Sequence, residues 1–460
     1  MVFTYIAGIF DSMQFIDIYD FLLLPFYVLL FLGIVVTRTK KMARPEQRKV
    51  FVTAFLLHMA GSFLYCMVIQ YYYGYGDSFG FYMGSNFLRK AIQIDGNPVN
   101  TIVMSGEEFA KKYALGGFGD LELPTGIQST SNLLVMKVSA LLSYISFNSY
   151  VVISLFFGFF AFAGVWRLFS VFSEALDRKM ERVLVFCILY MPSVCFWGSG
   201  LMKDSLCLGL VGFIVHGLYK LFIKKEVSIR SAILVIVCFY LLFLLKSYIA
   251  TSLAASAVLG YVLKVIHNSR GNIIKLGLVV SILLIVGVFV VVSASSTMES
   301  IIEESKSQIE IFKGAYANTD DERSVASFST TDFDFSITGI LARSPLAVFS
   351  TLFRPFIWET RKPIMLLSAL ESFVTLLATL YILLRTRVIG FFRYIFGSPL
   401  LFSVFIFVAL LSAIVGFTTF NFGTLVRYRL PVLPFYYFIL LAIYIKHKNN
   451  QPPDTALPGN

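Results

Sequence analysis

The sequence predicts an all-α polytopic integral membrane protein with about eleven transmembrane helices. Hydrophobic residues make up 57% of the 460 residues and charged residues only 14%, and the mean hydropathy is +0.78. Apolar runs of about 20 residues, the length that crosses a bilayer, recur along the chain. The Lys and Arg residues fall mostly in short loops between these runs. The net charge of +11 therefore indicates the positive-inside pattern and argues against a nucleic-acid-binding protein.

The basic clusters also predict the orientation. The first apolar run is followed by a strongly basic loop, which we expect in the cytoplasm, so the N-terminus lies outside and the C-terminus inside. Two long polar segments then become outer-face loops that carry short interfacial helices. We predict one transmembrane domain (1–450) with outer loops 72–132 and 293–362, and a disordered tail (451–460). The predicted spans are residues 19–36, 50–71, 150–172, 183–197, 205–222, 231–245, 248–266, 276–292, 363–384, 399–417 and 431–445.

No sequence motif indicates a cofactor or a metal site. All five cysteines lie in or beside predicted spans without metal-ligand spacing, which favours a packing role. His58 lies within a span and is interpreted as a packed or hydrogen-bonded residue. Asp332 and Asp334 could contribute to a divalent-cation site, but no full ligand set follows them. We therefore predict no certain cofactor, with a divalent cation as the open alternative.

The first candidate site residue is Asp77. It is the one carboxylate of the aromatic and glycine-rich stretch 71–87, which directly follows the second predicted span. A carboxylate at the outer membrane edge could act as a general base on an incoming hydroxyl. The alternative is an aromatic belt with a turn-forming aspartate.

A second candidate lies where an apolar run ends at Pro192 and another begins after Lys203 and Asp204. Charges at such a junction are costly unless they pair, bind a ligand or meet water. Lys203, with Lys246 of a later connection, could contact a phosphate, while Trp197 and Asp204 would line a cleft for a lipid chain or sugar ring. The alternative is an ion pair between Lys203 and Asp204 themselves at the head of a helix, with Asp204 favoured by the helix N-terminus.

Two more candidates come from later outer connections. Arg354 and Glu359 bracket an aromatic run with Trp358, which indicates a cleft-lining or merely interfacial segment. Arg427 and Arg429 precede Pro431 and the last predicted span. In an extended segment their side chains would point to the same side, and arginine suits bidentate phosphate recognition, so we interpret the two as a phosphate clamp.

The stretch YGDSFGFY (75–82) resembles the first outer loop of GT-C-type glycosyltransferases, which use polyprenyl-phosphate sugars. WGSGLMKDS, FRPFIWE and RYRLP are similar to stretches of uncharacterised multispan proteins of bacterial surface-polysaccharide loci. Asp77 departs from the family pattern, because it follows the second predicted span and not the first.

The resemblance implies a glycosyltransferase of the bacterial inner membrane. It would move a sugar from a polyprenyl-linked donor to an acceptor glycan or lipid on the outer face, with Asp77 as catalytic base. Arg427, Arg429, Lys203 and Lys246 would bind the donor phosphate. An O-antigen-type polysaccharide polymerase or ligase is the neighbouring alternative. A flippase or transporter of lipid-linked saccharide is the alternative from another class, although mid-span ionisable residues are nearly absent apart from histidines.

Overall fold

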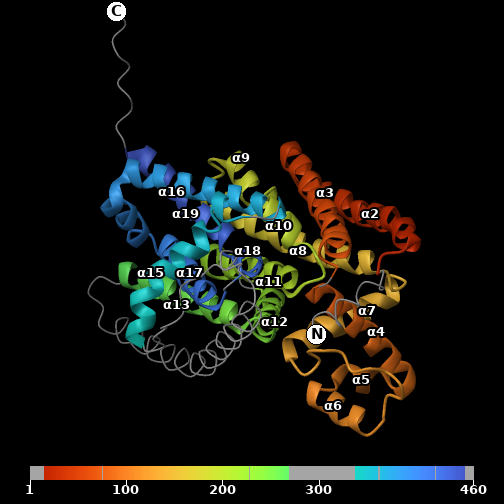
Figure 1. The fold of residues 1–460 in the computed structure, drawn as a ribbon. Coiled ribbons are helices and arrows are strands. Elements are labelled where there is room, and N and C mark those ends of the chain that lie inside the picture. Colours follow the sequence, from red (N-terminus) through yellow and green to blue (C-terminus); the bar gives the residue numbers. More distant parts are fainter. Residues whose placement is uncertain are drawn as a thin grey trace, which may run out of the picture. The chain divides into compact units, whose positions relative to one another are not determined.

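The computed structural model describes residues 15–74, 76–226, 228–268, 337–360, 363–419 and 421–450. Within these ranges the regular structure is helical, without strands (Figure 1). The chain divides into two compact units. Unit 1 comprises Met1–Val171 and Ile188–Lys246, and unit 2 comprises Phe172–Cys187 and Ser247–Asn460. The prediction of an all-α polytopic membrane protein is thus confirmed at the level of fold class.

Seven helical stretches in the described ranges are long and apolar enough to cross a membrane, and a bent pair raises the count to eight. The count of about eleven is not confirmed. The predicted eighth span (276–292) and the tail lie outside the described residues, as does most of the loop 293–362. The seven are Ile18–Thr39, Pro45–Tyr73, Tyr150–Ala175, Lys203–Lys224, Ser247–His267, Pro363–Phe396 and Pro399–Thr418.

The predicted span 183–197 is wrong as a continuous helix. The chain there forms α9 (Glu181–Leu184), the π-helical η2 (Val185–Leu189) and the short α10 (Pro192–Trp197). Pro192 stands at the first position of α10, where its missing N–H costs nothing but where the preceding helix cannot continue through it. A non-helical break, 198–202, then separates α10 from α11 (Lys203–Leu218).

In unit 1, α3 (Pro45–Val68) packs against both α2 (Ile18–Thr39) and α10, and α11 packs against α7 (Thr130–Ile145) and α12 (Ile229–Leu245). The long helix α8 (Tyr150–Ala175) approaches α11 at glycines. A Cβ atom at Gly212 would come within 2.0 Å of the Gly164 carbonyl oxygen. Small residues at a helix crossing let two backbones approach closely, which is typical of packing in membranes.

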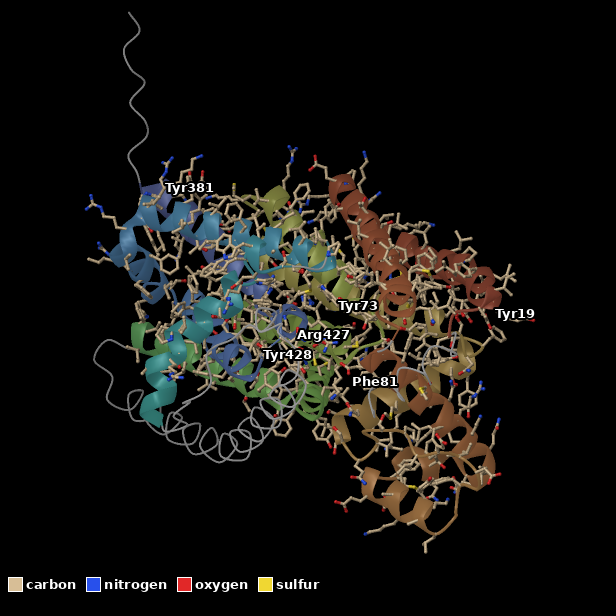
Figure 2. All side chains as sticks on the ribbon, in the orientation of Figure 1. Tyr19, Tyr73, Phe81, Tyr381, Arg427 and Tyr428 are labelled. Carbon is tan, nitrogen blue, oxygen red and sulfur yellow. The ribbon has the colours of Figure 1, made fainter. Side chains whose placement is uncertain are left out.

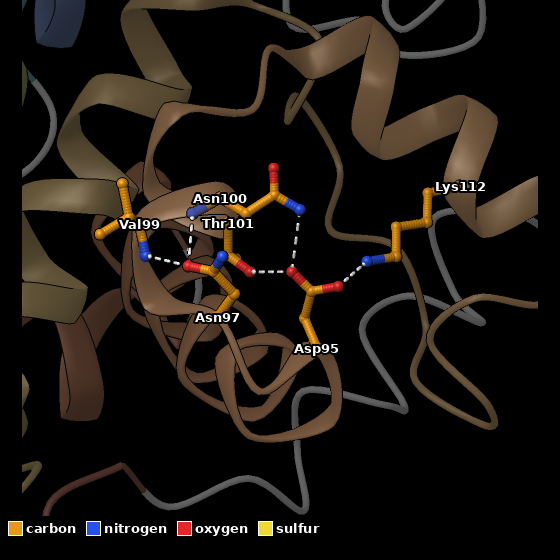
Figure 3. Close-up of polar contacts among 6 residues, drawn as sticks. All are labelled: Asp95, Asn97, Val99, Asn100, Thr101 and Lys112. Carbon is orange, nitrogen blue, oxygen red and sulfur yellow. Dashed lines mark hydrogen bonds and ion pairs between the residues drawn. The ribbon is translucent and has the colours of Figure 1, made fainter.

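The segment predicted as the first outer loop forms α4 (Asp77–Asp95), α5 (Pro98–Val103) and α6 (Gly106–Ala114) before α7 begins. Asp95, at the end of α4, joins these helices (Figure 3). Its carboxylate accepts hydrogen bonds from Asn100 Nδ2 at 3.1 Å and Thr101 Oγ1 at 3.3 Å, and it pairs with Lys112 of α6. We call these four residues the Asp95 knot. The hydrogen bonds from Lys112 and Asn100 lower the pKa of Asp95 below its ordinary value.

The Asp95 knot should stabilise α4–α6 in a pH-dependent way. The folded-state pKa of Asp95 is depressed, so its contribution is complete above the unfolded-state pKa of about 3.9 and is lost as the pH falls through the folded value. Asp95→Asn should therefore raise hydrogen exchange of the α5 amides, corrected for intrinsic rates, at pH 7. The difference from the parent should vanish once the pH has fallen below the folded-state pKa of Asp95, because the carboxyl group is then protonated.

Asp120→Asn, which replaces an exposed aspartate of the α6–α7 connection, serves as the control and should match the parent throughout. Equal α5 protection in the parent and in Asp95→Asn at pH 7 would contradict the role of the knot.

Unit 2 is built around α17 (Pro399–Thr418), which packs against α13 (Ser247–Asn268), α15 (Ile337–Phe353), α16 (Pro363–Phe396) and α19 (Leu433–Asn450). The backbone of α16 is bent at Arg387, which has φ 57°. Tyr381 lies on this helix (Figure 2), with the Arg385 guanidinium 5.3 Å from its ring centre. The exposed apolar side chains of α16 indicate a lipid-facing surface; they include Leu366, Leu367, Leu370, Phe373, Val374, Leu377, Leu380 and Leu384.

Candidate functional site

The start of α11 carries a buried ion pair. Lys246 Nζ lies 2.5 Å from Asp204 Oδ1, and the two side chains are only 7% and 5% exposed. Asp204 stands in the first turn of α11, and Lys246 is the C-cap of α12, which packs against α11. Each charge therefore lies at the helix end whose dipole favours it. The ion pair expected between Lys203 and Asp204 is corrected, because the salt bridge of Asp204 is made with Lys246.

Lys203 extends this pair into a cluster. Its Nζ donates to Ser131 Oγ of α7 at 2.7 Å, and it interacts electrostatically with Lys246, Asp77 and Asp204. A cation at a helix N-terminus is opposed by the helix dipole, so Lys203 needs negative partners there. We call Asp77, Ser131, Lys203, Asp204 and Lys246 the α11 cluster. Four residues that the sequence placed at three separate connections thus belong to one group in unit 1.

Asp77 is the exposed member of the α11 cluster. It begins α4, and the N-cap Gly76 before it has φ 151°, a backbone conformation that favours glycine. Tyr73 and Phe81, marked in Figure 2, flank this turn in the sequence. The next residue, Ser78, is fully buried and lies 2.8 Å from the hydroxyl of Tyr150, which anchors the first turn of α4. The cluster therefore runs from a buried ion pair to an accessible carboxylate.

Trp197, expected to line a cleft, lies in the core of unit 1. It is 6% exposed, and its ring packs edge-on against Tyr65 of α3 with ring centres 6.1 Å apart. The adjacent break is equally close-packed, because a Cβ atom at Gly200 would come within 2.3 Å of the Tyr65 ring. Trp197 thus supports the segment that carries Lys203 and Asp204, and it presents little surface to a ligand.

Unit 2 holds a second group of the expected residues. Arg354 pairs with Glu359 through Nη2 and Oε1 at 2.5 Å, and Nε donates to the same oxygen at 3.0 Å. Glu359 also accepts the backbone N–H of Phe356 at 2.8 Å. Trp358 is 78% exposed and stacks on Phe356 with ring centres 4.8 Å apart. This arrangement fits the interfacial interpretation, since the charges neutralise each other while an indole faces outward.

The two arginines near the C-terminus do not lie in an extended segment, which corrects that expectation. Arg427 belongs to α18 (Phe422–Tyr428), and Arg429 is its C-cap (Figure 2 marks Arg427 and Tyr428). Residues two apart on a helix point in different directions. The Asn421 side chain caps this helix by accepting the N–H of Gly423 at 2.8 Å, and α18 meets α19 at a 62° bend.

Arg429 is fully buried, and its guanidinium holds protein acceptors. Nη1 donates to the Arg354 carbonyl at 2.7 Å and to Ser372 Oγ at 2.8 Å, and Nη2 donates to the Ser368 carbonyl at 3.2 Å. It thereby ties the end of α18 to α16 and to the segment that carries the Arg354–Glu359 pair. Arg427 is half-buried, so of the two arginines it is the one with side-chain surface accessible to a ligand.

Sequence reasoning missed three polar residues of unit 1. Ser131 bonds Lys203, although nothing in its local sequence indicates this. Asp20 of α2 is buried and caps the start of α8, accepting hydrogen bonds from Ser149 Oγ and from the N–H of Val151 at 3.2 Å. The spacing of Asp17 and Asp20 before an apolar run signals their capping box, but not the contact with α8. Ser199 bonds His58 and is treated below.

The described residues contain no group of three His, Cys, Asp or Glu side chains suited to a metal ion. Asp332 and Asp334 lie outside the described ranges. No family model, curated protein or solved structure matches the chain. The candidate site therefore depends on its own geometry, above all on the α11 cluster.

Proposed function

We propose that the chain is a membrane glycosyltransferase of the bacterial inner membrane that uses a polyprenyl-phosphate sugar as donor. The observation that carries the proposal is the α11 cluster, in which an exposed carboxylate, Asp77, interacts electrostatically with Lys203 beside the buried Asp204–Lys246 pair. Apolar helices around such a cluster suit a substrate with a lipid chain and a charged head.

In the proposed reaction Asp77 is the general base. The acceptor hydroxyl gives its proton to the Asp77 carboxylate while its oxygen forms a bond to the anomeric carbon of the donor sugar. The bond from that carbon to the phosphate oxygen breaks, and polyprenyl phosphate leaves. Lys203 would stabilise the negative charge that develops on the leaving phosphate. The acceptor is a glycan or lipid on the outer face.

The other expected phosphate ligands take supporting roles in this proposal. Lys246 neutralises Asp204, and Arg429 holds backbone carbonyls, so neither side chain has its charge available without a rearrangement. Arg427 belongs to unit 2 and is proposed as a phosphate contact of that unit by itself. Arg354, Trp358 and Glu359 form an interfacial segment suited to contact the polyprenyl chain.

Transfer assays on the purified protein in lipid vesicles test the proposal, with polyprenyl-phosphate glucose, galactose and mannose as donors and cell-envelope glycolipids as acceptors. Asp77→Asn should lower the rate of transfer by about 10²–10⁴-fold and leave donor binding intact, because only the base is lost. Lys203→Met should weaken donor binding by roughly tenfold to hundredfold, because one charge-assisted contact is removed.

Asp120→Asn is the matched control and should transfer sugar at the parental rate. Parental transfer by Asp77→Asn would remove the base assignment. Repeated addition of saccharide units would identify the polymerase alternative instead. Movement of a lipid-linked saccharide between leaflets, without a new glycosidic bond, would identify the transporter alternative.

A further inference from the structure

A buried hydrogen bond inside unit 1 joins His58 of α3 to Ser199. Nδ1 of His58 lies 3.0 Å from Oγ of Ser199, and both residues are fully buried. His58 stands near the middle of the span Pro45–Tyr73, and Ser199 belongs to the break 198–202 between α10 and α11. A histidine among apolar helices loses the hydration of its ring, so its burial is costly and the hydrogen bond to Ser199 offsets part of that cost.

The break is the backbone that places Lys203 and Asp204. Non-helical backbone at membrane depth is tolerated only where the protein itself surrounds it, and residues 198–202 are all buried. Within the break, the side chain of Ser199 forms a hydrogen bond to another helix, while the Gly200 carbonyl accepts from Ser205 Oγ of α11 at 2.6 Å. The Ser199 contact thus links the break to α3.

Close packing also holds the break, because a Cβ atom at Gly158 of α8 would come within 3.0 Å of the Ser199 carbonyl oxygen. Gly200 lies against the Tyr65 ring, and Gly61 of α3 lies against the Cys195 carbonyl, so the break cannot move closer to α3. Packing of this kind has little directional preference, whereas the hydrogen bond between Nδ1 and Oγ fixes both a distance and a direction. The pair His58–Ser199 therefore completes the constraint.

We propose that His58 is a positioning residue, which holds the break through Ser199 and thereby sets the place of Lys203 and Asp204 in the α11 cluster. The value of Lys203 as a phosphate contact rests on the proposed function, but the position of residue 203 can be measured without turnover. A failure of this inference therefore leaves sugar transfer untouched, and a failure of sugar transfer leaves this device intact.

The test is the rate at which a membrane-impermeant methanethiosulfonate reagent labels Lys203→Cys in the full-length protein, followed for that peptide by mass spectrometry. Ser199→Ala and His58→Ala should each raise the labelling rate by roughly threefold to tenfold, which corresponds to the loss of one hydrogen bond between membrane helices. The double variant should be labelled no faster than either single variant, because both remove the same bond.

Two conservative variants make the test specific. His58→Asn keeps a polar atom near the place of Nδ1 and should restore the parental rate, whereas His58→Gln places its amide nearer Nε2 and should not. Ser62→Ala is the matched control, since Ser62 lies one turn from His58, is fully buried and has no hydrogen-bond partner within the described ranges. It should leave labelling unchanged.

A parental labelling rate in Ser199→Ala overturns the proposal, and so does an equal rise in Ser62→Ala. If His58→Ala does not fold, Ser199→Ala and His58→Asn still decide the question.

Discussion

Lys246→Ala should destabilise the protein by about 3–5 kcal/mol, because the buried Asp204 carboxylate loses the ammonium group 2.5 Å away that neutralises it. The loss should be smaller when both charges are removed together. Asp204→Leu combined with Lys246→Met replaces the pair by apolar side chains of fitting size, and such replacements of buried pairs are often neutral or stabilising. The protein would then keep its fold while losing one of the two negative partners of Lys203, and Asp77 would remain.

The measurement is the free energy of reversible unfolding in detergent. An exposed ion pair of the same unit serves as the control. Lys220 and Glu226 lie 3.7 Å apart with side chains 42% and 62% exposed. Lys220→Ala should change the free energy of unfolding by less than about 1 kcal/mol, because water screens the pair. Equal effects of Lys246→Ala and Lys220→Ala would show that burial of the first pair contributes nothing.

The partner of Asp204 illustrates what sequence alone can reveal. The break in the apolar pattern placed Lys203, Asp204 and Lys246 at the ends of spans, and this part of the prediction depends only on the cost of charge in lipid. The neighbour in sequence, Lys203, was the natural partner to consider for Asp204. Successive residues on a helix point about 100° apart, so the partner is set by which helix packs alongside, and α12 supplies Lys246.

The predicted spans likewise separate into those that local sequence locates and one that depends on tertiary contacts. Hydropathy located α2, α8, α11, α13 and α17 to within a few residues, because lipid requires a long apolar helix. It failed at 183–197, where composition is apolar but Pro192 interrupts the backbone. An apolar run has the same average whether the chain is one helix or several short ones buried against neighbours. The interruption of the predicted span therefore depends on tertiary contacts, which a local average of hydropathy does not contain.

The prediction that the side chains of Arg427 and Arg429 point to the same side was wrong for a related reason. Their spacing suggested a shared direction, which holds for a strand but not for α18. The asparagine at 421, followed by a short run before Pro431, was a capping signal for a helix. The burial of Arg429 could not be read locally, because its acceptors come from 57 to 75 residues away along the chain.

Arg429→Met should lower the free energy of unfolding by about 3–5 kcal/mol, since it keeps the apolar volume but removes three charge-assisted hydrogen bonds inside unit 2. Arg429→Lys should recover only part of the loss, because one ammonium lacks the planar fork that reaches the Arg354 carbonyl, Ser372 and the Ser368 carbonyl together. A donor-phosphate contact predicts the opposite result, a stable protein with weakened binding.

Denaturant unfolding in detergent and donor binding, measured on the same variants, separate these two roles of Arg429. Arg393→Ala is the control for removal of an arginine from the same unit, since Arg393 is exposed on α16 and should shift stability by no more than about 0.5 kcal/mol. If Arg429→Met unfolds like the parent and binds donor poorly, the guanidinium serves the ligand. If it is destabilised, the segment that carries Arg354 and Glu359 owes its position to Arg429.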